Sequence, residues 1–136
     1  MDSVTLIIPI EPVAKGRPRV NKKGWTFTPK KTQEFEKQVA DYYKQTRAQY
    51  FDENTPLFVT MVFDMPIPKS YSKKRRKWIL DGYESYTKKP DLDNLAKGVL
   101  DALNGVAWAD DSQIIGLNLR KQYSEEPQIW LSIRTV

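Results

Sequence analysis

The sequence predicts an α/β fold of the mixed α+β kind, a small mixed β-sheet with helices packed on it. Three observations predict it: short apolar runs that end at prolines, two segments with helical spacing of apolar residues, and the alternation of the two along the chain. With 136 residues, 40% of them apolar, the chain is long enough for an ordinary hydrophobic core. We therefore expect a single domain spanning residues 1–136.

The first thirty residues contain two predicted strands separated by a basic loop. Residues 4–10 are apolar until the run stops at proline, apart from Thr5, and are expected to form a well-covered strand. Residues 15–23, KGRPRVNKK, are expected to be a loop because Gly16 and Pro18 interrupt regular structure. A second short strand is predicted over residues 25–28.

A helix is predicted from about residue 29 to residue 50, followed by a turn and a strand. Phe35, Val39, Tyr42 or Tyr43, and Thr46 recur at the spacing of one helical face. Pro29 suits the first turn of a helix, although Thr32 can serve as the N-cap instead. After the turn at residues 52–56, the valine- and phenylalanine-rich residues 57–65 predict a strand that ends at proline.

The second half of the chain predicts a short helix, a longer helix and a β-hairpin. Ser70 or Ser72 can cap a short helix that ends near Gly82. Residues 92–104 place leucine, valine and alanine along one stripe of a helix, so one face of it is expected to be buried. Residues 114–123 and 128–136 are predicted to be two strands that the SEEP turn joins into an antiparallel hairpin.

The residue types that are missing exclude several classes of chemistry. Without histidine or cysteine, the chain cannot build a Ser-His-Asp triad, a histidine general base, a thiolate site or a typical zinc site. Oxygen ligands favour Mg²⁺, Mn²⁺ or Ca²⁺ instead. The sequence has no apolar run of the roughly 18 residues that a membrane span requires and no signal-peptide pattern. We expect a cytoplasmic protein with no membrane partner and no small-molecule cofactor.

Charge divides the chain into a basic part and an acidic part. Residues 1–90 hold 18 Lys/Arg against 10 Asp/Glu, whereas residues 91–136 hold 4 against 7. Six of the nine residues in 69–77 are basic. Scattered lysines usually only solubilise a surface, but runs this dense predict contact with a polyanion such as nucleic acid.

Five aspartates lie between positions 91 and 111, within PDLDNLAKGVLDALNGVAWADDSQI. Helical geometry puts Asp93 and Lys97 on the same side of the predicted helix, one turn apart. Asp91 would lie about 200° around the helix from Asp93, so the two converge only if Asp91 precedes the helix. The residue before Pro90 is pushed out of the helical region, which favours that arrangement.

The aspartates have a structural interpretation as well as a catalytic one. Asp91 can simply cap the helix, and Asp93–Lys97 and Lys97–Asp101 can be surface ion pairs. The adjacent pair Asp110–Asp111, however, is poor turn chemistry unless a cation neutralises it. Together the two clusters favour Asp91, Asp93 and one of the adjacent pair as ligands of one or two Mg²⁺ ions. Lys97 is then expected to stabilise charge in the transition state.

These residues carry a resemblance to a known family. PDLDNLAKGVLDALNG at 90–105, followed by WADDSQI at 108–114, resembles the RusA family of Holliday-junction resolvases, endodeoxyribonucleases common in bacteria and their prophages. A weaker likeness covers KGRPR at 15–19, TPKKTQEFE at 28–36 and the strand before Pro66. Residues 69–86 match least well and look like an insertion or a variable region.

The resemblance implies a fold, an activity and a set of residues. It implies a RusA-like fold and a homodimer that needs Mg²⁺ or Mn²⁺ and makes paired nicks in four-way DNA during recombination and repair. It assigns the metal ligands to Asp91, Asp93 and Asp111, and the essential lysine to Lys97. Two rival functions stay open: a non-enzymatic basic DNA-binding module and a metal-dependent phosphohydrolase of small nucleotides.

The basic residues are expected to bind the DNA backbone without reading its sequence. The partner implied is branched DNA, and Trp25, Phe27 or Tyr71 can stack on unpaired bases at the crossover. Burial in the core or in a dimer interface is the alternative for each aromatic ring. The predicted DNA-binding residues are Lys15, Arg17, Arg19, Lys22, Lys23, Lys73, Lys74, Arg75, Arg76 and Lys77.

Overall fold

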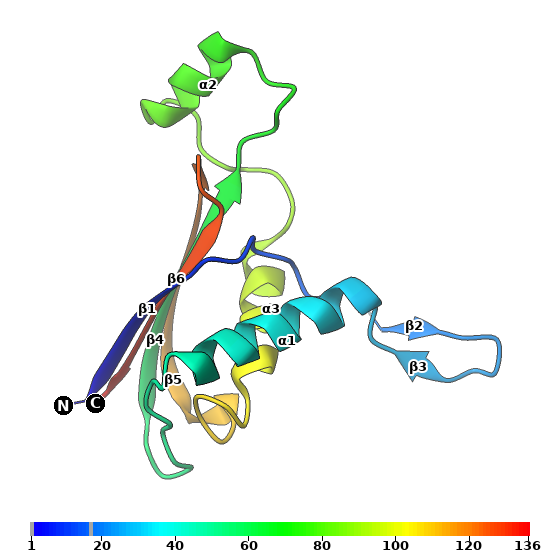
Figure 1. Ribbon diagram of the computed structural model, residues 1–136, viewed down its shortest axis with the longest axis vertical. Coiled ribbons are helices and arrows are strands. Elements are labelled where there is room, and N and C mark those ends of the chain that lie inside the picture. Colours follow the sequence, from blue (N-terminus) through cyan, green and yellow to red (C-terminus); the bar gives the residue numbers. More distant parts are fainter. Residues whose placement is uncertain (1, 17) are drawn as a thin grey trace.

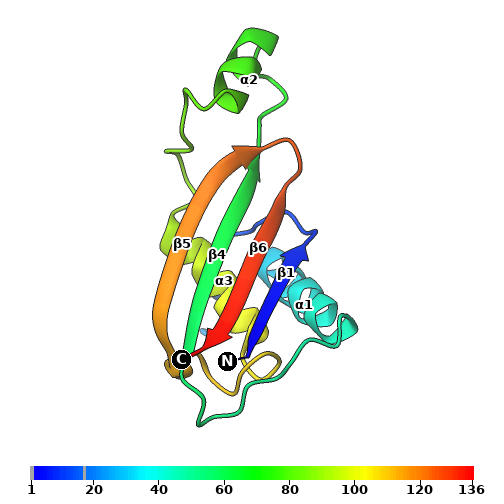
Figure 2. The ribbon, with the colours of Figure 1, turned by 90° about the vertical axis from the view of Figure 1, so that its left-hand side faces the viewer.

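The structure is a computed structural model that describes residues 2–16 and 18–136, and it confirms the α+β class. Over these residues a four-stranded mixed sheet has the strand order β1-β6-β4-β5, and two helices, α1 and α3, lie on one of its faces (Figures 1 and 2). The elements are β1 (Ser3–Ile8), β2 (Arg19–Val20), β3 (Thr26–Phe27), α1 (Lys30–Gln45), β4 (Leu57–Pro66), α2 (Lys73–Leu80), α3 (Leu92–Leu103), the 3₁₀ turn η1 (Asp111–Gln113), β5 (Ile114–Ser124) and β6 (Gln128–Thr135).

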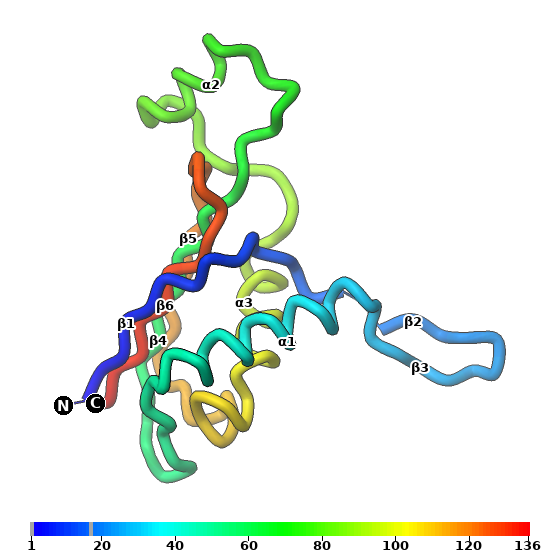
Figure 3. Tube along the Cα trace, viewed as in Figure 1, coloured from blue at the N-terminus to red at the C-terminus, as the bar shows by residue number. Residues whose placement is uncertain are grey.

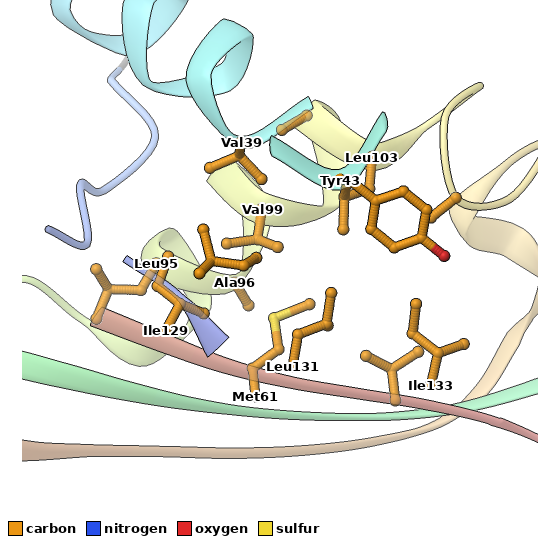
Figure 4. Close-up of a cluster of buried hydrophobic side chains, with 14 of the residues drawn as sticks. Val39, Tyr43, Met61, Leu95, Ala96, Val99, Leu103, Ile129, Leu131 and Ile133 are labelled. Carbon is orange, nitrogen blue, oxygen red and sulfur yellow. The ribbon is translucent and has the colours of Figure 1, made fainter. Parts of the chain in front are cut away.

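The core lies between the sheet and the two helices. The predicted stripe of α3 is buried through Leu95, Val99 and Leu103, and α1 contributes Val39 and Tyr43 from its own apolar face. Figure 4 shows these side chains meeting Met61 of β4 and the isoleucines and leucine of β6. Because α3 is packed into the core along its length, both of its ends are held in fixed positions relative to the sheet.

The predicted hairpin of the last two strands is wrong. β5 pairs with β4 in parallel, β4 pairs with β6 antiparallel, and β4 therefore separates the last two strands. The turn pattern correctly indicated that the chain reverses after Ser124. The residues of a turn do not indicate, however, whether a third strand lies between the two strands that the turn connects. Strand β4 is buried at Leu57, Val59, Met61 and Phe63, and a central position gives it a neighbour on each side.

The first strand is also less covered than its sequence suggested. β1 ends at Ile8 instead of residue 10, and its burial alternates along the strand, with Ile7 41% exposed and Ile8 fully buried. It is an edge strand, paired only with β6 within the described residues. A short apolar run looks the same in sequence whether one or both faces are covered, and here the helices cover one face.

The first and second helices differ from expectation mainly at their ends. α1 ends at Gln45, several residues before the predicted end, and its N-cap is Pro29. Thr32 is buried and accepts a hydrogen bond from the backbone N–H of Gly16 at 3.0 Å, so it anchors the basic loop instead of capping the helix. In α2, Ser72 is the N-cap and its hydroxyl accepts from the N–H of Arg75 at 3.1 Å.

Two segments extend away from the packed body. Residues 67–90, which we call the arm, carry α2 beyond one end of the sheet, and the β2–β3 ribbon extends from the start of α1 (Figures 1 and 3). The poorly matching, strongly basic segment of the sequence therefore forms most of the arm. Among the described residues, no helix is both long enough and apolar enough to cross a membrane.

Candidate active site

Two carboxylates at the N-terminal end of α3 make few hydrogen bonds within the protein. Asp91 has an extended backbone, with φ −72° and ψ 150°, and its side chain makes no capping hydrogen bond in the part of the chain that the structure describes. The prediction that Asp91 precedes the helix is confirmed. Asp93 accepts a hydrogen bond from the N–H of Asn94 at 2.9 Å, and both aspartates are exposed. The capping interpretation of Asp91 therefore loses its support.

Contacts from β5 and from the arm fix the position of this helix end. Lys121 of β5 donates through Nζ to the carbonyl oxygens of Lys88 and Pro90, at 2.9 and 3.0 Å. Tyr86 donates its hydroxyl to the carbonyl of Lys89 at 3.0 Å, and its ring packs edge-on against Tyr123. The chain entering Asp91 is therefore tied to the sheet at several points just before the carboxylates.

Lys97 belongs to a chain of ion pairs along α3. Its Nζ lies 3.5 Å from Oδ2 of Asp101, which also lies 3.0 Å from Nζ of Lys15. Lys15 in turn contacts Glu36 of α1 at 2.8 Å. Asp101 thus holds Lys97 from the C-terminal side, as a residue that orients it would. The Lys97 side chain is 60% exposed and is free to meet an anion near Asp93.

Lys15 has a structural role that its place in a basic run did not indicate. Its side chain is only 18% exposed and lies between two carboxylates. Burial opposes its charge, but hydrogen bonds to Glu36 and Asp101 outweigh that effect and raise the pKa of Lys15. The loop approaches α3 closely because Gly98 has no side chain: a Cβ there would lie 3.1 Å from the Val13 carbonyl oxygen. The structure thus commits Lys15 to ion pairs within the fold.

At the other end of α3, polar side chains hold the fold together. Asp110 caps η1 by accepting from the N–H of Ser112 at 3.1 Å, and these contacts with Ser112 lower the pKa of Asp110. Gln113 accepts from the N–H groups of Ala109 and Asp110, and donates to the carbonyls of Asp52 and Thr55. Asp111 takes no part in these bonds and is half-buried.

Asp111 and the Asp91–Asp93 pair lie at opposite ends of α3. Lys121, which contacts the Pro90 carbonyl, is seven residues along β5 from Ile114, whereas Asp111 comes just before that strand. At about 3.3 Å per residue, that stretch of strand spans about 23 Å. Accordingly, no three acidic side chains of residues 2–16 and 18–136 are grouped closely enough to hold a metal. One chain supplies the two-carboxylate part of the predicted site but not its third ligand.

A groove of about 570 Å³ adjoins the carboxylate pair. It lies between the loop that follows β1 and the base of the arm, and Pro90 forms part of its wall. Basic residues Arg19 and Lys31 line it, together with the buried ring of Tyr86. A phosphate-bearing strand lying in this groove would pass next to the N-terminal end of α3.

The other predicted DNA-binding residues lie mainly on the two extensions. Arg19 lies in β2 and Lys22 and Lys23 in the turn that follows, and all three are exposed; Arg17 lies outside the described residues. Lys73, Lys74, Arg75, Arg76 and Lys77 form the first five residues of α2. Two of them have acidic partners: Arg75 contacts Glu84 at 3.0 Å and Lys77 contacts Asp81 at 2.7 Å.

The aromatic residues expected to stack on bases differ in availability. Trp25 and Phe27 on the ribbon are 68% and 45% exposed. The ring of Tyr71 is covered by the Arg75 guanidinium, whose carbon lies 3.6 Å from the ring centroid. The sequence interpretation missed Trp78 and Tyr83 on the arm and the positioning contacts of Lys121 and Glu36. The sequence signal for Trp78 and Tyr83 was the presence of aromatic residues within and beside a basic run. The contacts of Lys121 and Glu36 join distant segments of the chain, so the sequence contains no local signal for them.

Comparison with known proteins identifies the family. The family model described as "Endodeoxyribonuclease RusA" matches residues 9–134. The chain is 39% identical over its whole length to the uncharacterized protein YqaN of Bacillus subtilis (strain 168), of which the match covers 99%. It is 31% identical to the crossover junction endodeoxyribonuclease rusA of Lactococcus phage r1t, over 71% of this chain and 68% of that protein. With its mixed sheet and its exposed aspartates before and in the first turn of α3, the chain belongs to the RusA endodeoxyribonuclease family.

Proposed function

We propose that this nuclease is a structure-selective endonuclease that cuts branched DNA, four-way junctions above all, in recombination and repair. The observation that carries the proposal is the exposed carboxylate pair, Asp91 and Asp93, which lies beside a groove that contains Arg19 and Lys31 and at the base of a basic arm. Carboxylates without an internal cation favour a bound metal ion, and basic surfaces favour a polyanionic substrate. The junction itself is suggested by the name of the phage relative.

We propose Mg²⁺ or Mn²⁺ as the cofactor, held by Asp91, Asp93 and Asp111. Mg²⁺ keeps several waters and is usually bound by one or two carboxylates together with substrate phosphates, so the pair on α3 fits part of a site. A metal ion there would offset negative charge on the scissile phosphate. The Lys97 ammonium, one helical turn from Asp93, would add a second positive charge on the same side.

The position of Asp111 leads us to propose that a second copy of the chain completes the site. A two-fold axis that relates the two ends of α3 in different subunits would place Asp111 of one copy beside Asp91 and Asp93 of the other. Each homodimer would then contain two equivalent sites. A four-way junction is itself close to two-fold symmetric, so two such sites suit paired nicking.

A cleavage assay tests the activity. The protein should nick a four-way junction in the presence of Mg²⁺, and EDTA should abolish the nicking. Asp91→Asn and Asp111→Asn should bind the junction but not cut it, and Lys97→Ala should lose more cleavage than binding. Full cleavage by either purified aspartate variant would remove that residue from the site. Comparison with a fork and a linear duplex measures the structural selectivity.

Mixing two inactive variants tests whether the site is shared between subunits. In a heterodimer of Asp93→Asn and Asp111→Asn, one shared site carries both substitutions and the other carries neither. Mixing should therefore restore single-strand nicking and one Mn²⁺ site per dimer, measured by electron paramagnetic resonance. Mixing Asp91→Asn with Asp93→Asn should restore nothing, because both residues belong to the same half-site. No recovery in the first mixture, with heterodimers verified, would place the whole site in one chain.

Salt dependence tests the DNA surface. We propose that Lys22 and Lys23 on the ribbon and the unpaired cations of α2 contact phosphates. Each phosphate contact removed should reduce the slope of log affinity against log salt by about 0.9. Neutralising Lys73 and Lys74 should therefore lower both junction affinity and slope, while neutralising Lys15 should affect folding stability more than the slope. An unchanged slope in the Lys73/Lys74 variant would exclude α2 from the DNA interface.

A further inference from the structure

The arm carries a pair of exposed aromatic rings that have no role in the proposed metal site. Trp78 and Tyr83 stack on each other, with ring centroids 4.5 Å apart and planes inclined by 27°. They are nevertheless 53% and 68% exposed, and Leu80 beside them is 45% exposed. The only buried residue of α2 is Ile79. The arm therefore presents apolar ring surface to solvent at the C-terminal end of α2.

The way in which α2 ends accounts for an apolar contact between positions 78 and 83. It does not account for the presence of exposed aromatic rings at both positions. α2 ends at Leu80 and is followed by Gly82, whose φ of +88° suits glycine, and the N–H of Tyr83 donates to the Trp78 carbonyl at 3.1 Å. This type of helix end is commonly accompanied by an apolar contact between those two residues. An aliphatic side chain at each position would provide that contact while exposing less apolar surface.

Positive charge surrounds the ring pair. Residues 69–89 hold eight Lys/Arg against two Asp/Glu, a surplus of six, compared with +5 for the whole chain. The two acids are already paired with Arg75 and Lys77. Five successive cations begin α2, where the helix dipole disfavours positive charge. That arrangement destabilises the free helix, and a bound polyanion would relieve the repulsion.

The chemistry favours a nucleic acid over a membrane surface as the occupant. A membrane-binding helix separates a basic face from an apolar face, whereas five successive basic residues surround α2 at one end and its apolar residues lie at the other. Single-stranded nucleic acid is bound by cations that follow the backbone and by aromatic rings on which bases stack. Each ring of the pair is stacked on one face by its partner, and more than half of each residue's surface is exposed, so a base could extend the stack.

The arm is placed to act on the same DNA as the carboxylates. It leads directly into Pro90 and Asp91, and Tyr86 and Lys121 fix its base to the sheet. Figure 1 shows the arm beyond the end of the sheet that is nearer the N-terminal end of α3, with the last residues of the arm leading to that helix. DNA bound at the N-terminal end of α3 would therefore meet the arm.

We propose that Trp78 and Tyr83 form a stacking platform for unpaired bases at the branch point of the DNA. The proposal rests on the proposed function, because it assigns to the arm the recognition of branched over linear DNA. The basic residues of α2 hold the phosphates of the displaced strand, and a base continues the stack formed by the two rings. Linear duplex, in which every base is already stacked, gains nothing from the platform.

The test uses Asp93→Asn protein, which should bind without cutting, and forked DNA with 2-aminopurine in its single-stranded arm next to the branch. Binding should quench the 2-aminopurine fluorescence through stacking. Trp78→Leu and Tyr83→Leu keep the apolar contact that closes α2, and each should weaken fork binding at least about fivefold and reduce the quenching. Trp78→Phe keeps a ring and should retain most of both. The salt slope should stay the same in all three variants because no cation is lost.

Two controls isolate the rings. Leu80→Gln changes an exposed neighbour on the same helical turn, and Tyr50→Leu removes an exposed ring far from the arm; both should bind the fork as the parent does. Thermal melting verifies that each variant is folded. The quenching measured with the parent protein does not depend on the folding of any arm variant, because its arm is unchanged. The platform would be overturned if the parent protein did not quench the fluorescence. It would also be overturned if both leucine variants bound the fork as tightly as the parent does. Binding to anionic vesicles with no fork preference would overturn it in favour of a membrane partner, whereas failure to bind any branched DNA would overturn the proposed function.

Discussion

The two ends of α3 use acidic residues in opposite ways. At the N-terminal end, Asp91 and Asp93 are exposed and accept one hydrogen bond between them. At the other end, Asp110 and Gln113 form a reciprocal cap, and Gln113 alone makes four hydrogen bonds. Both ends belong to one acidic segment in the sequence. The difference shows that an acidic cluster becomes a candidate for chemistry only where the fold leaves its oxygens unused.

Asp111 is the exception that connects the two ends. Its side chain lies beside the cap without contributing to it, and we propose that this carboxylate is a metal ligand. Its separation from Asp91 and Asp93 along about 23 Å of β5 means that a single chain holds only part of the metal site that we propose. The comparison of the ends can therefore be tested by asking which substitutions affect cleavage and which affect folding.

The largest effect is expected from Asp93→Asn. The substitution removes a charged oxygen that no buried cation contacts, so cleavage should fall at least about 10²-fold, more than the loss typical of residues behind a metal ligand. The free energy of unfolding should change by less than about 0.5 kcal/mol, as is usual for exposed positions. Junction nicking rates and urea denaturation measure the two quantities. A stability loss that matches the activity loss would mean that Asp93 is structural.

Gln113→Ala should show the reverse behaviour. Gln113 is 9% exposed, and its removal leaves two N–H groups and two carbonyls without their partner. We expect a loss of about 2–4 kcal/mol in the free energy of unfolding. Cleavage per folded molecule should be unchanged at a temperature where the variant is folded. A fully stable variant would show that water replaces the amide at this end of the helix.

Lys15→Met should lower stability by an intermediate amount, about 1–2 kcal/mol, because it leaves Glu36 and Asp101 close together and mostly buried. Since the pKa of Lys15 is raised above its usual 10.5, its contribution is complete below that pH and is lost as the pH rises through the higher value in the folded protein. The melting temperatures of wild type and variant should therefore differ by a constant amount from pH 7 to 10 and converge above that.

The matched control for Lys15 is Lys30→Met. Lys30 faces Glu34 at 3.9 Å with its side chain 88% exposed, so its replacement should change stability by less than about 0.5 kcal/mol. A similar loss in both variants would mean that the three-residue ion pair around Lys15 contributes no more than a surface pair does.

The sequence predicted the helices better than the pairing of the strands. The apolar stripe of α3 follows from a local rule, helical spacing, and the restriction on Lys89 before Pro90 agrees with a helix that begins only after Asp91. The insertion of β4 between β5 and β6 depends on contacts between distant residues, which no short window of sequence contains. The same limit applies to Lys15: its partners Glu36 and Asp101 are 21 and 86 positions away.

The sequence could propose residues for the site but not their geometry. Residue types and spacing selected Asp91, Asp93, Lys97 and one of Asp110 and Asp111, and the family resemblance selected Asp111. One-dimensional spacing suggested that Asp111 folds back onto the first pair. The 12 residues of α3 are a rigid rod of about 18 Å, which carries the chain away from Asp91 before η1 begins. A rigid helix between two halves of a motif therefore separates them within one subunit.

The smallest effect, and the sharpest comparison of neighbours, is expected from Asp110→Asn. Asparagine still accepts the N–H of Ser112, so the cap persists and only the charge is lost. Because its hydrogen bonds with Ser112 lower the pKa of Asp110 below the usual 3.8, the stability that its charge adds is present above that pH and is lost as the pH falls through the lower value in the folded protein. Wild type should exceed the variant slightly in melting temperature at pH 5–7, and the difference should vanish in stronger acid.

Cleavage should be unchanged in Asp110→Asn, whereas Asp111→Asn, one residue along, should abolish it. Equal loss of cleavage in the two variants would mean that the cap itself, and not the Asp111 carboxylate, is what this end of α3 contributes to the reaction.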